Sequence, residues 1–157
     1  MLNINSILGN IFKDTSLEYA NFEKLIISRI DLEKRILRKK TNLGTDIGIN
    51  LNSSTKLQHG DIIGNDETKI IVEQMPEKVI SVKLKENDEK IAILLGHIIG
   101  NRHRPIAIKD KMILFPIQED SELEIFQRLF KEIIGYIELK IEEEIFLPHT
   151  SADVHEH

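Results

Sequence analysis

Segment 95–105, Leu-Gly-His-Ile-Ile-Gly-Asn-Arg-His-Arg-Pro, places a histidine between two arginines where a predicted helix gives way to a predicted strand. Apolar residues precede it at helical spacing (i, i+3, i+4, i+7 and i+8): Ile91, Leu94, Leu95, Ile98 and Ile99. Glycine and asparagine readily adopt the left-handed conformation that ends helices, and a residue before proline is restricted to extended geometry. We therefore expect the helix to stop at Gly100, Pro105 to begin an extended segment, and His103 to lie on an accessible corner.

The first 75 residues alternate short apolar segments with turn signals. Segments 3–11, 22–29, 45–51, 57–63 and 69–73 have the composition or alternation of strands, and Asn42-Leu43-Gly44 predicts a hairpin turn. No segment before Pro76 has the periodicity of a helix. Strands at this spacing are typical of a small β-sandwich or barrel, so residues 1–75 are predicted to form a β-rich domain.

The pattern changes at Pro76. Segments 78–84, 105–108, 112–116 and 136–146 read as strands, and helical periodicity recurs after the capping sequences Asn87-Asp88-Glu89 and Asp120-Ser121. The second helix is expected to end at Gly135. The order β-α-β-β-α-β is that of the ferredoxin-like arrangement, two helices on one face of a four-stranded sheet. The predicted fold class is α+β, an N-terminal all-β domain followed by a ferredoxin-like domain at 76–147, with a mobile tail at 148–157.

Composition narrows the classes of function. The chain has no cysteine, so a transition-metal site must be built from imidazole and carboxylate. The net charge of -5 argues against nucleic acid as the main partner. No secretory signal and no apolar run near the ~18 residues of a membrane span is visible, so we expect a cytoplasmic protein with no membrane partner. No nucleophile, acid-base pair or nucleotide-binding glycine loop is recognisable, and an enzyme is not expected.

His103 is the leading candidate ligand. A histidine on a loop after a helix is most often a surface residue without a role, which is the alternative to weigh. However, Gly96 and Gly100 lie four residues apart on the preceding helix, which would let a second backbone approach. A two-fold interface there would turn one histidine per chain into a facing pair.

Two imidazoles are too few for tight binding of Ni²⁺ or Zn²⁺, which require four or more ligands. The tail contains three histidines that could supply the remainder: His149, His155 and His157. An ordinary polar terminus is the simpler interpretation of these residues. His97 precedes His103 by six residues, about 240° around an ideal helix, so the two would not share a face if the helix continued to His103, and we expect His97 to be exposed or to lie just outside the ligand set. For His59, in a turn of the β half, a structural role is favoured.

A basic cluster at 34–40 contains the candidate partner-binding residues Arg35, Arg38 and Lys39. Such a cluster is most often a solvated strand face. Its functional interpretation is a docking surface for RNA or an acidic protein, which makes a non-metal interaction module the alternative function. In that case RNA binding would depend steeply on salt.

The sequence Gly100-Asn101-Arg102-His103 resembles the signature of UreE, the urease accessory proteins that carry nickel. Segments 31–41, 44–49 and 57–62 are similar to the N-terminal domain of that family, the β-α-β-β-α-β half to its metal-binding domain, and the tail to its variable C-terminus. The resemblance implies a homodimer joined through the second domain, with His103 of each subunit at a shared Ni²⁺ site that could also hold Zn²⁺. It also implies a first domain that contacts partners, namely urease and its other accessory proteins.

Overall fold

The computed structural model describes residues 1–16 and 18–149. These residues divide into two compact units, one from Met1 to Met75 and one that begins at Pro76. Each unit has its own apolar core and is described separately below. No helix in the described part of the chain is long and apolar enough to cross a membrane.

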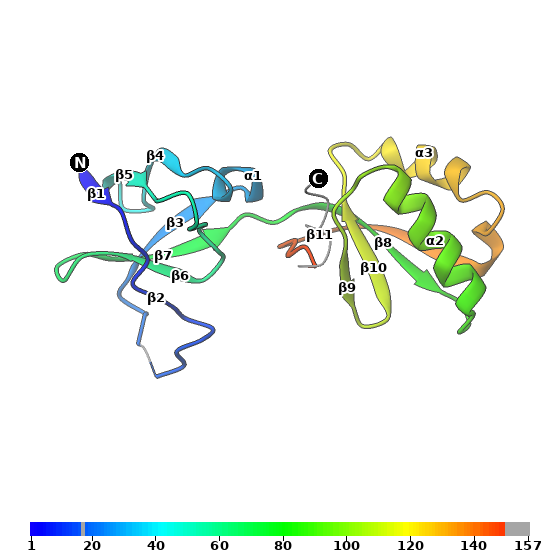
Figure 1. The fold of residues 1–157 in the computed structure, drawn as a ribbon, viewed down its shortest axis with the longest axis horizontal. Coiled ribbons are helices and arrows are strands. Elements are labelled where there is room, and N and C mark those ends of the chain that lie inside the picture. Colours follow the sequence, from blue (N-terminus) through cyan, green and yellow to red (C-terminus); the bar gives the residue numbers. More distant parts are fainter. Residues whose placement is uncertain (17, 150–157) are drawn as a thin grey trace. The chain divides into compact units, whose positions relative to one another are not determined.

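The first unit contains two sheets (Figure 1). The strands and the one short helix are β1 (Leu2–Ile4), β2 (Gly9–Asn10), β3 (Glu23–Ile27), α1 (Arg29–Leu32), β4 (Ile36–Lys40), β5 (Asp46–Asn50), β6 (Asp61–Gly64) and β7 (Lys69–Gln74). The strand orders are β1-β5-β4 in the 3-stranded sheet and β2-β6-β7-β3 in the 4-stranded sheet. Strands β1 and β5 pair in parallel, as do β3 and β7, whereas the remaining pairs are antiparallel.

Both sheets contribute to one core, which is the arrangement expected of a sandwich. Alternate residues of β5 point inward, and Ile47 and Ile49 are buried with Ile4 of β1. The second sheet contributes Ile63 and Val72 to the same core cluster. Because side chains alternate along a strand, these apolar alternations fix which face of each sheet is buried. The predicted strand-rich N-terminal half and its hairpin between β4 and β5 are confirmed.

Three details of this unit differ from the sequence prediction. Segment 3–11 is not one strand, because β1 and β2 belong to different sheets. The segment predicted as a strand from residue 57 becomes one only at Asp61. A helix does occur before Pro76, since α1 is capped by Ser28, whose side chain accepts a hydrogen bond from the Asp31 N–H at 3.2 Å. Four residues are too few to show helical periodicity in a sequence.

The second unit has the predicted β-α-β-β-α-β order. Its elements are β8 (Glu77–Leu84), α2 (Glu89–Asn101), β9 (Ala107–Lys109), β10 (Met112–Pro116), α3 (Glu122–Leu129), a 3₁₀ turn (Ile134–Tyr136) and β11 (Ile137–Glu144). The sheet order is β11-β8-β10-β9 with every pair antiparallel, and Figure 1 shows α2 and α3 on the same face. The ferredoxin-like topology is therefore confirmed.

The core of this unit lies between the helices and the sheet. Helix α2 buries Ile91, Leu95 and Ile99, the predicted apolar positions nearest the sheet. Helix α3 is shorter than predicted, because it ends at Leu129 and the chain reaches Gly135 through turns. Ser121 precedes it without a side-chain capping hydrogen bond.

Candidate metal centre

The corner that carries His103 is built by the C-terminal end of α2. The helix begins at Asp88, whose side chain accepts a hydrogen bond from the Ile91 N–H at 3.2 Å. At the other end, the Arg102 N–H donates to the carbonyl of Ile99 and the His103 N–H to that of Gly100, both at 3.0 Å. These hydrogen bonds, each between residues three apart, satisfy carbonyl groups that have no partner within the α-helix. The helix thus continues past Gly100 to Asn101, beyond the predicted stop.

The left-handed residue of the corner is His103 itself. Its φ is +54°, whereas Gly100 remains helical. Histidine is among the few non-glycine residues that adopt this region with any frequency, at a cost of about 1 kcal/mol or more. The conformation turns the chain sharply before Pro105, and the His103 side chain is exposed.

Arg104 fixes the residue after His103 to the body of the unit. Its Nη1 donates to the carbonyl oxygen of Pro116 at 2.7 Å, and its Nη2 donates to Oε1 of Glu122 at 2.6 Å. The guanidinium lies 5.4 Å from the centre of the Phe126 ring. The sequence alone does not reveal this contact, because Arg104 and Glu122 are far apart in the chain and belong to no shared pattern. It holds the corner against the end of β10 and the start of α3.

The pKa of Glu122 reflects this position. Burial raises the pKa of its carboxyl, but hydrogen bonds from the Arg104 guanidinium and from the N–H groups of Gln118 and Glu119 outweigh burial, and the pKa lies below its ordinary value. A carboxyl whose pKa is lowered on folding stabilises the folded state above its unfolded-state pKa. That stabilisation is lost as the pH falls through the folded-state pKa.

Replacement of Glu122 by glutamine should lower the free energy of unfolding by about 1–2 kcal/mol at pH 7, because the charge-assisted bonds to Arg104 are weakened. Below the ordinary glutamate value of 4.5, the difference between wild type and Glu122→Gln should shrink. Urea unfolding of both proteins over a pH series measures this difference in the free energy of unfolding. Glu124→Gln, on the exposed side of the same helix, is the matched control and should have little effect. A difference that stays constant down to pH 3 would contradict the assignment.

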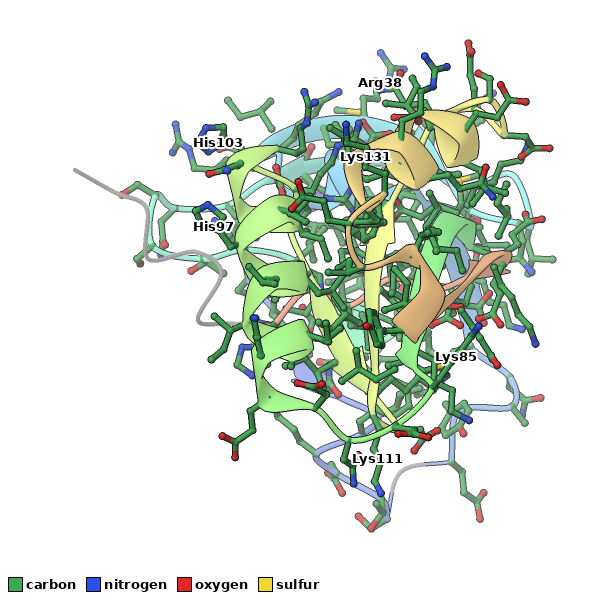
Figure 2. The ribbon with its side chains drawn as sticks, turned by 90° about the vertical axis from the view of Figure 1, so that its right-hand side faces the viewer. Arg38, Lys85, His97, His103, Lys111 and Lys131 are labelled. Atoms are coloured by element: carbon green, nitrogen blue, oxygen red, sulfur yellow. The ribbon has the colours of Figure 1, made fainter. Side chains whose placement is uncertain are left out.

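His97 and the two glycines form the outer side of α2. His97 is exposed, with its Nε2 3.4 Å from Nδ2 of Asn101. Because α2 ends before His103, the ideal-helix angle does not apply, and Figure 2 shows both histidines on the outer side of the helix near its C-terminal end. A Cβ placed at Gly96 or Gly100 would meet no atom within 4 Å beyond its chain neighbours and the backbone of its own helix. Ile93, one turn earlier, is 71% exposed, so this side combines open backbone with an apolar side chain.

The structure places one of the three tail histidines. The backbone N–H of His149 donates to the carbonyl oxygen of Ile106 at 2.7 Å, beside the strand that leaves the His103 corner. His155 and His157 lie outside the described residues. Among residues 1–16 and 18–149, no group of three or more histidine and carboxylate side chains is close enough to hold a metal ion.

His59 belongs to the first unit and has a structural role. Its Nδ1 accepts a hydrogen bond from the Gln74 N–H at 3.1 Å, and its ring lies 5.3 Å from that of Phe12. The imidazole thereby satisfies a backbone donor at the end of β7.

Lys34, Arg38 and Lys39 of the basic cluster at 34–40 are paired with carboxylates of their own unit. Arg38 forms a two-point pair with Asp46, at 3.2 Å and 2.7 Å. Lys39 and Lys34 pair with Asp31 at 3.2 Å and 2.8 Å. Arg35 is exposed. Because Asp31 and Asp46 offset two of the five positive charges at 34–40, this surface attracts phosphate less strongly than its sequence suggests but keeps a net positive charge.

Comparison with known proteins gives a consistent result. Residues 4–74 match the family model described as UreE urease accessory protein, N-terminal domain. The chain is similar to the urease accessory protein UreE of Streptococcus vestibularis, with 32% identity over 151 residues that cover 94% of this chain and 95% of that protein. It is 37% identical over 126 residues to that of Staphylococcus epidermidis, covering 77% and 79%. For Yersinia bercovieri the identity is 31% over 131 residues, covering 74% and 58%.

Proposed function

The chain belongs to the UreE family of urease accessory proteins, and from this premise we propose that it is a metallochaperone that binds Ni²⁺ through His103 and delivers it to the urease maturation complex. The observation that carries the proposal is the exposed, left-handed His103 at the end of α2. Neutral imidazole suits both Ni²⁺ and Zn²⁺, so Zn²⁺ could occupy the same site. The metal is the cargo of the protein and not a group that performs a reaction on it.

A homodimer would complete more of the site. One His103 supplies a single imidazole, and a two-fold axis beside the corner would supply a second at the same ion. The outer side of α2 is suited to such an approach because Gly96 and Gly100 leave its backbone open and Ile93 is exposed. The tail histidines His149, His155 and His157 are the proposed additional ligands. A site assembled from so few fixed ligands would release its ion readily, which favours a carrier.

The first unit is the proposed contact for urease and its other accessory proteins, through the exposed residues Arg35, Arg38 and Lys39 of the basic cluster. We place this activity in the cytoplasm, without nucleic acid or membrane as a partner. An accessory protein of this kind carries out no catalysis of its own.

The experiment that tests the proposal is nickel calorimetry on the wild-type chain and on His103→Ala. The variant should lose the tightest nickel site, because it removes the proposed pair of corner imidazoles and leaves only the tail histidines as ligands. The fold, followed by circular dichroism, should be unchanged, since the His103 side chain is exposed. His97→Ala is the matched control, an exposed histidine near the C-terminal end of α2, and should retain the site. Unchanged nickel affinity in His103→Ala would remove the basis of the proposal, and the mass in solution with and without nickel tests the dimer.

A further inference from the structure

The face of the second sheet that lies away from the helices carries a small apolar cluster of its own. Along β8, Ile80 and Val82 point into the main core, so Val79 and Ser81 point to the opposite face. There Val79 and Leu114 pack with Phe146, which follows β11 and is 1% exposed. Ala107 and Met112 adjoin the same cluster. Phe146 is therefore a buried anchor outside any helix or strand.

The residues around this anchor cross the sheet from one edge to the other. Strands β11 and β9 are the two edges of the sheet order β11-β8-β10-β9. The chain leaves β11 at Glu144, buries Phe146 over the central strands, and reaches the β9 side, where the His149 N–H bonds to the carbonyl oxygen of Ile106. We call residues 145–149 the strap. Lys109 of β9 approaches Glu144 of β11 across the same face, with Nζ 3.8 Å from Oε1.

The strap brings His149 close to His103. Ile106 follows His103 by three residues, and an extended chain spans at most about 3.5 Å per residue, so the Cα atoms of His103 and Ile106 lie within about 10 Å of each other. His149 lies one backbone hydrogen bond further, on the segment beside Ile106. Imidazole side chains from these two neighbouring segments can be directed at one ion. Without the strap, His149 would be free to move away from the corner, and its effective concentration at the ion would fall.

We infer that Phe146 is a positioning residue: by seating the strap on the helix-free face of the sheet, it holds His149 at the His103 corner, where His149 joins the same nickel ion. The inference rests on the proposed function. Phe146 itself touches no metal. It acts only through His149, whose hydrogen bond to Ile106 it keeps in place.

The test compares Phe146→Ala with Leu147→Ala, the neighbouring apolar residue of the strap, which is 55% exposed. Phe146→Ala should weaken nickel binding by about 10- to 100-fold, the usual effect of losing a group that orients a ligand, whereas Leu147→Ala should leave it unchanged. Amide exchange should show loss of protection at the His149 N–H in Phe146→Ala only. Phe146→Leu should restore most of both signals, because leucine can fill the same apolar site.

A double-mutant cycle separates positioning from general damage. If Phe146 acts through His149, Phe146→Ala should have no further effect on nickel affinity in the His149→Ala background. Should Phe146→Ala fail to fold, insertion of two glycines after Leu147 releases His149 while the anchor stays in place, and the same loss of affinity is expected. Unchanged nickel affinity in Phe146→Ala or in the two-glycine insertion overturns this inference alone. So does a loss of affinity on Phe146→Ala that is equally large in the wild-type and His149→Ala backgrounds. A wild-type chain that binds no nickel overturns the proposed function as well.

Discussion

Replacement of Phe126 by alanine should lower the free energy of unfolding of the second unit by about 3–5 kcal/mol, the usual cost of deleting a buried aromatic side chain. Phe126 is 2% exposed on the inner side of α3. Its ring centre lies 4.5 Å from that of Phe115 and 5.8 Å from that of Phe130, so one deletion removes contacts from β10 and from the end of the helix. The chain has no tryptophan and six phenylalanines, and these three form the aromatic centre of the unit.

The same substitution should loosen the His103 corner. The Arg104 guanidinium rests over the Phe126 ring while it donates to Pro116 and Glu122. A cavity beneath the Arg104 guanidinium would let the arginine side chain move, and His103, the preceding residue, would become more mobile. Amide exchange resolved by peptide would measure both effects, loss of protection in α3 and β10 and faster exchange at 100–105. Ile125→Ala, one residue away and 47% exposed, is the matched control. Equal losses in the two variants would contradict the central role of Phe126.

The secondary structure of the second unit could be predicted because apolar residues recur every second position in its strands and every third or fourth position in its helices. Alternation along β8 and the three- and four-residue spacing of α2 are local signals, and the order of elements then restricts the topology to few choices. The accessible position of His103 follows from the same signals. Its left-handed conformation does not, because the sequence offered Gly100 and Asn101 as more obvious candidates.

The parts of the site that sequence analysis missed depend on contacts between distant residues. Arg104 and Glu122 belong to different elements, and Phe146 meets Val79 and Leu114 only after the sheet has formed. A single phenylalanine after a strand gives no periodic signal, so segment 145–149 could not be distinguished from the end of β11 or from the tail. The ion pairs of the basic cluster could not be predicted either, because Asp31 and Asp46 flank it in sequence without showing which of its cations they contact.

Replacement of Gly64 by alanine should lower the free energy of unfolding of the first unit by about 3 kcal/mol. Gly64 ends β6 at the hairpin to β7, with φ of +122°, a region that residues with a side chain rarely adopt. A Cβ added there would overlap the carbonyl oxygen of Thr68, which is backbone and cannot rotate away. That carbonyl also accepts the hydrogen bond from the Asn65 N–H at 2.9 Å that closes the turn.

The two units allow this prediction to be measured with an internal reference. Amide exchange should accelerate in peptides from β6 and β7, whose strands the turn joins, while protection of β8 and β10 in the second unit should change little. Gly135→Ala is the matched control: Gly135 lies in the exposed 3₁₀ turn without a positive φ, and its Cβ would meet no atom within 4 Å beyond its chain neighbours and the backbone of its own turn, so alanine should stabilise the second unit by about 0.4–1 kcal/mol. Equal effects of the two substitutions would show that loss of glycine flexibility, and not the positive φ and the Thr68 carbonyl, sets the cost. If the two substitutions change the free energy of unfolding with opposite signs, the destabilisation at Gly64 comes from its conformation, because both substitutions add the same methyl group.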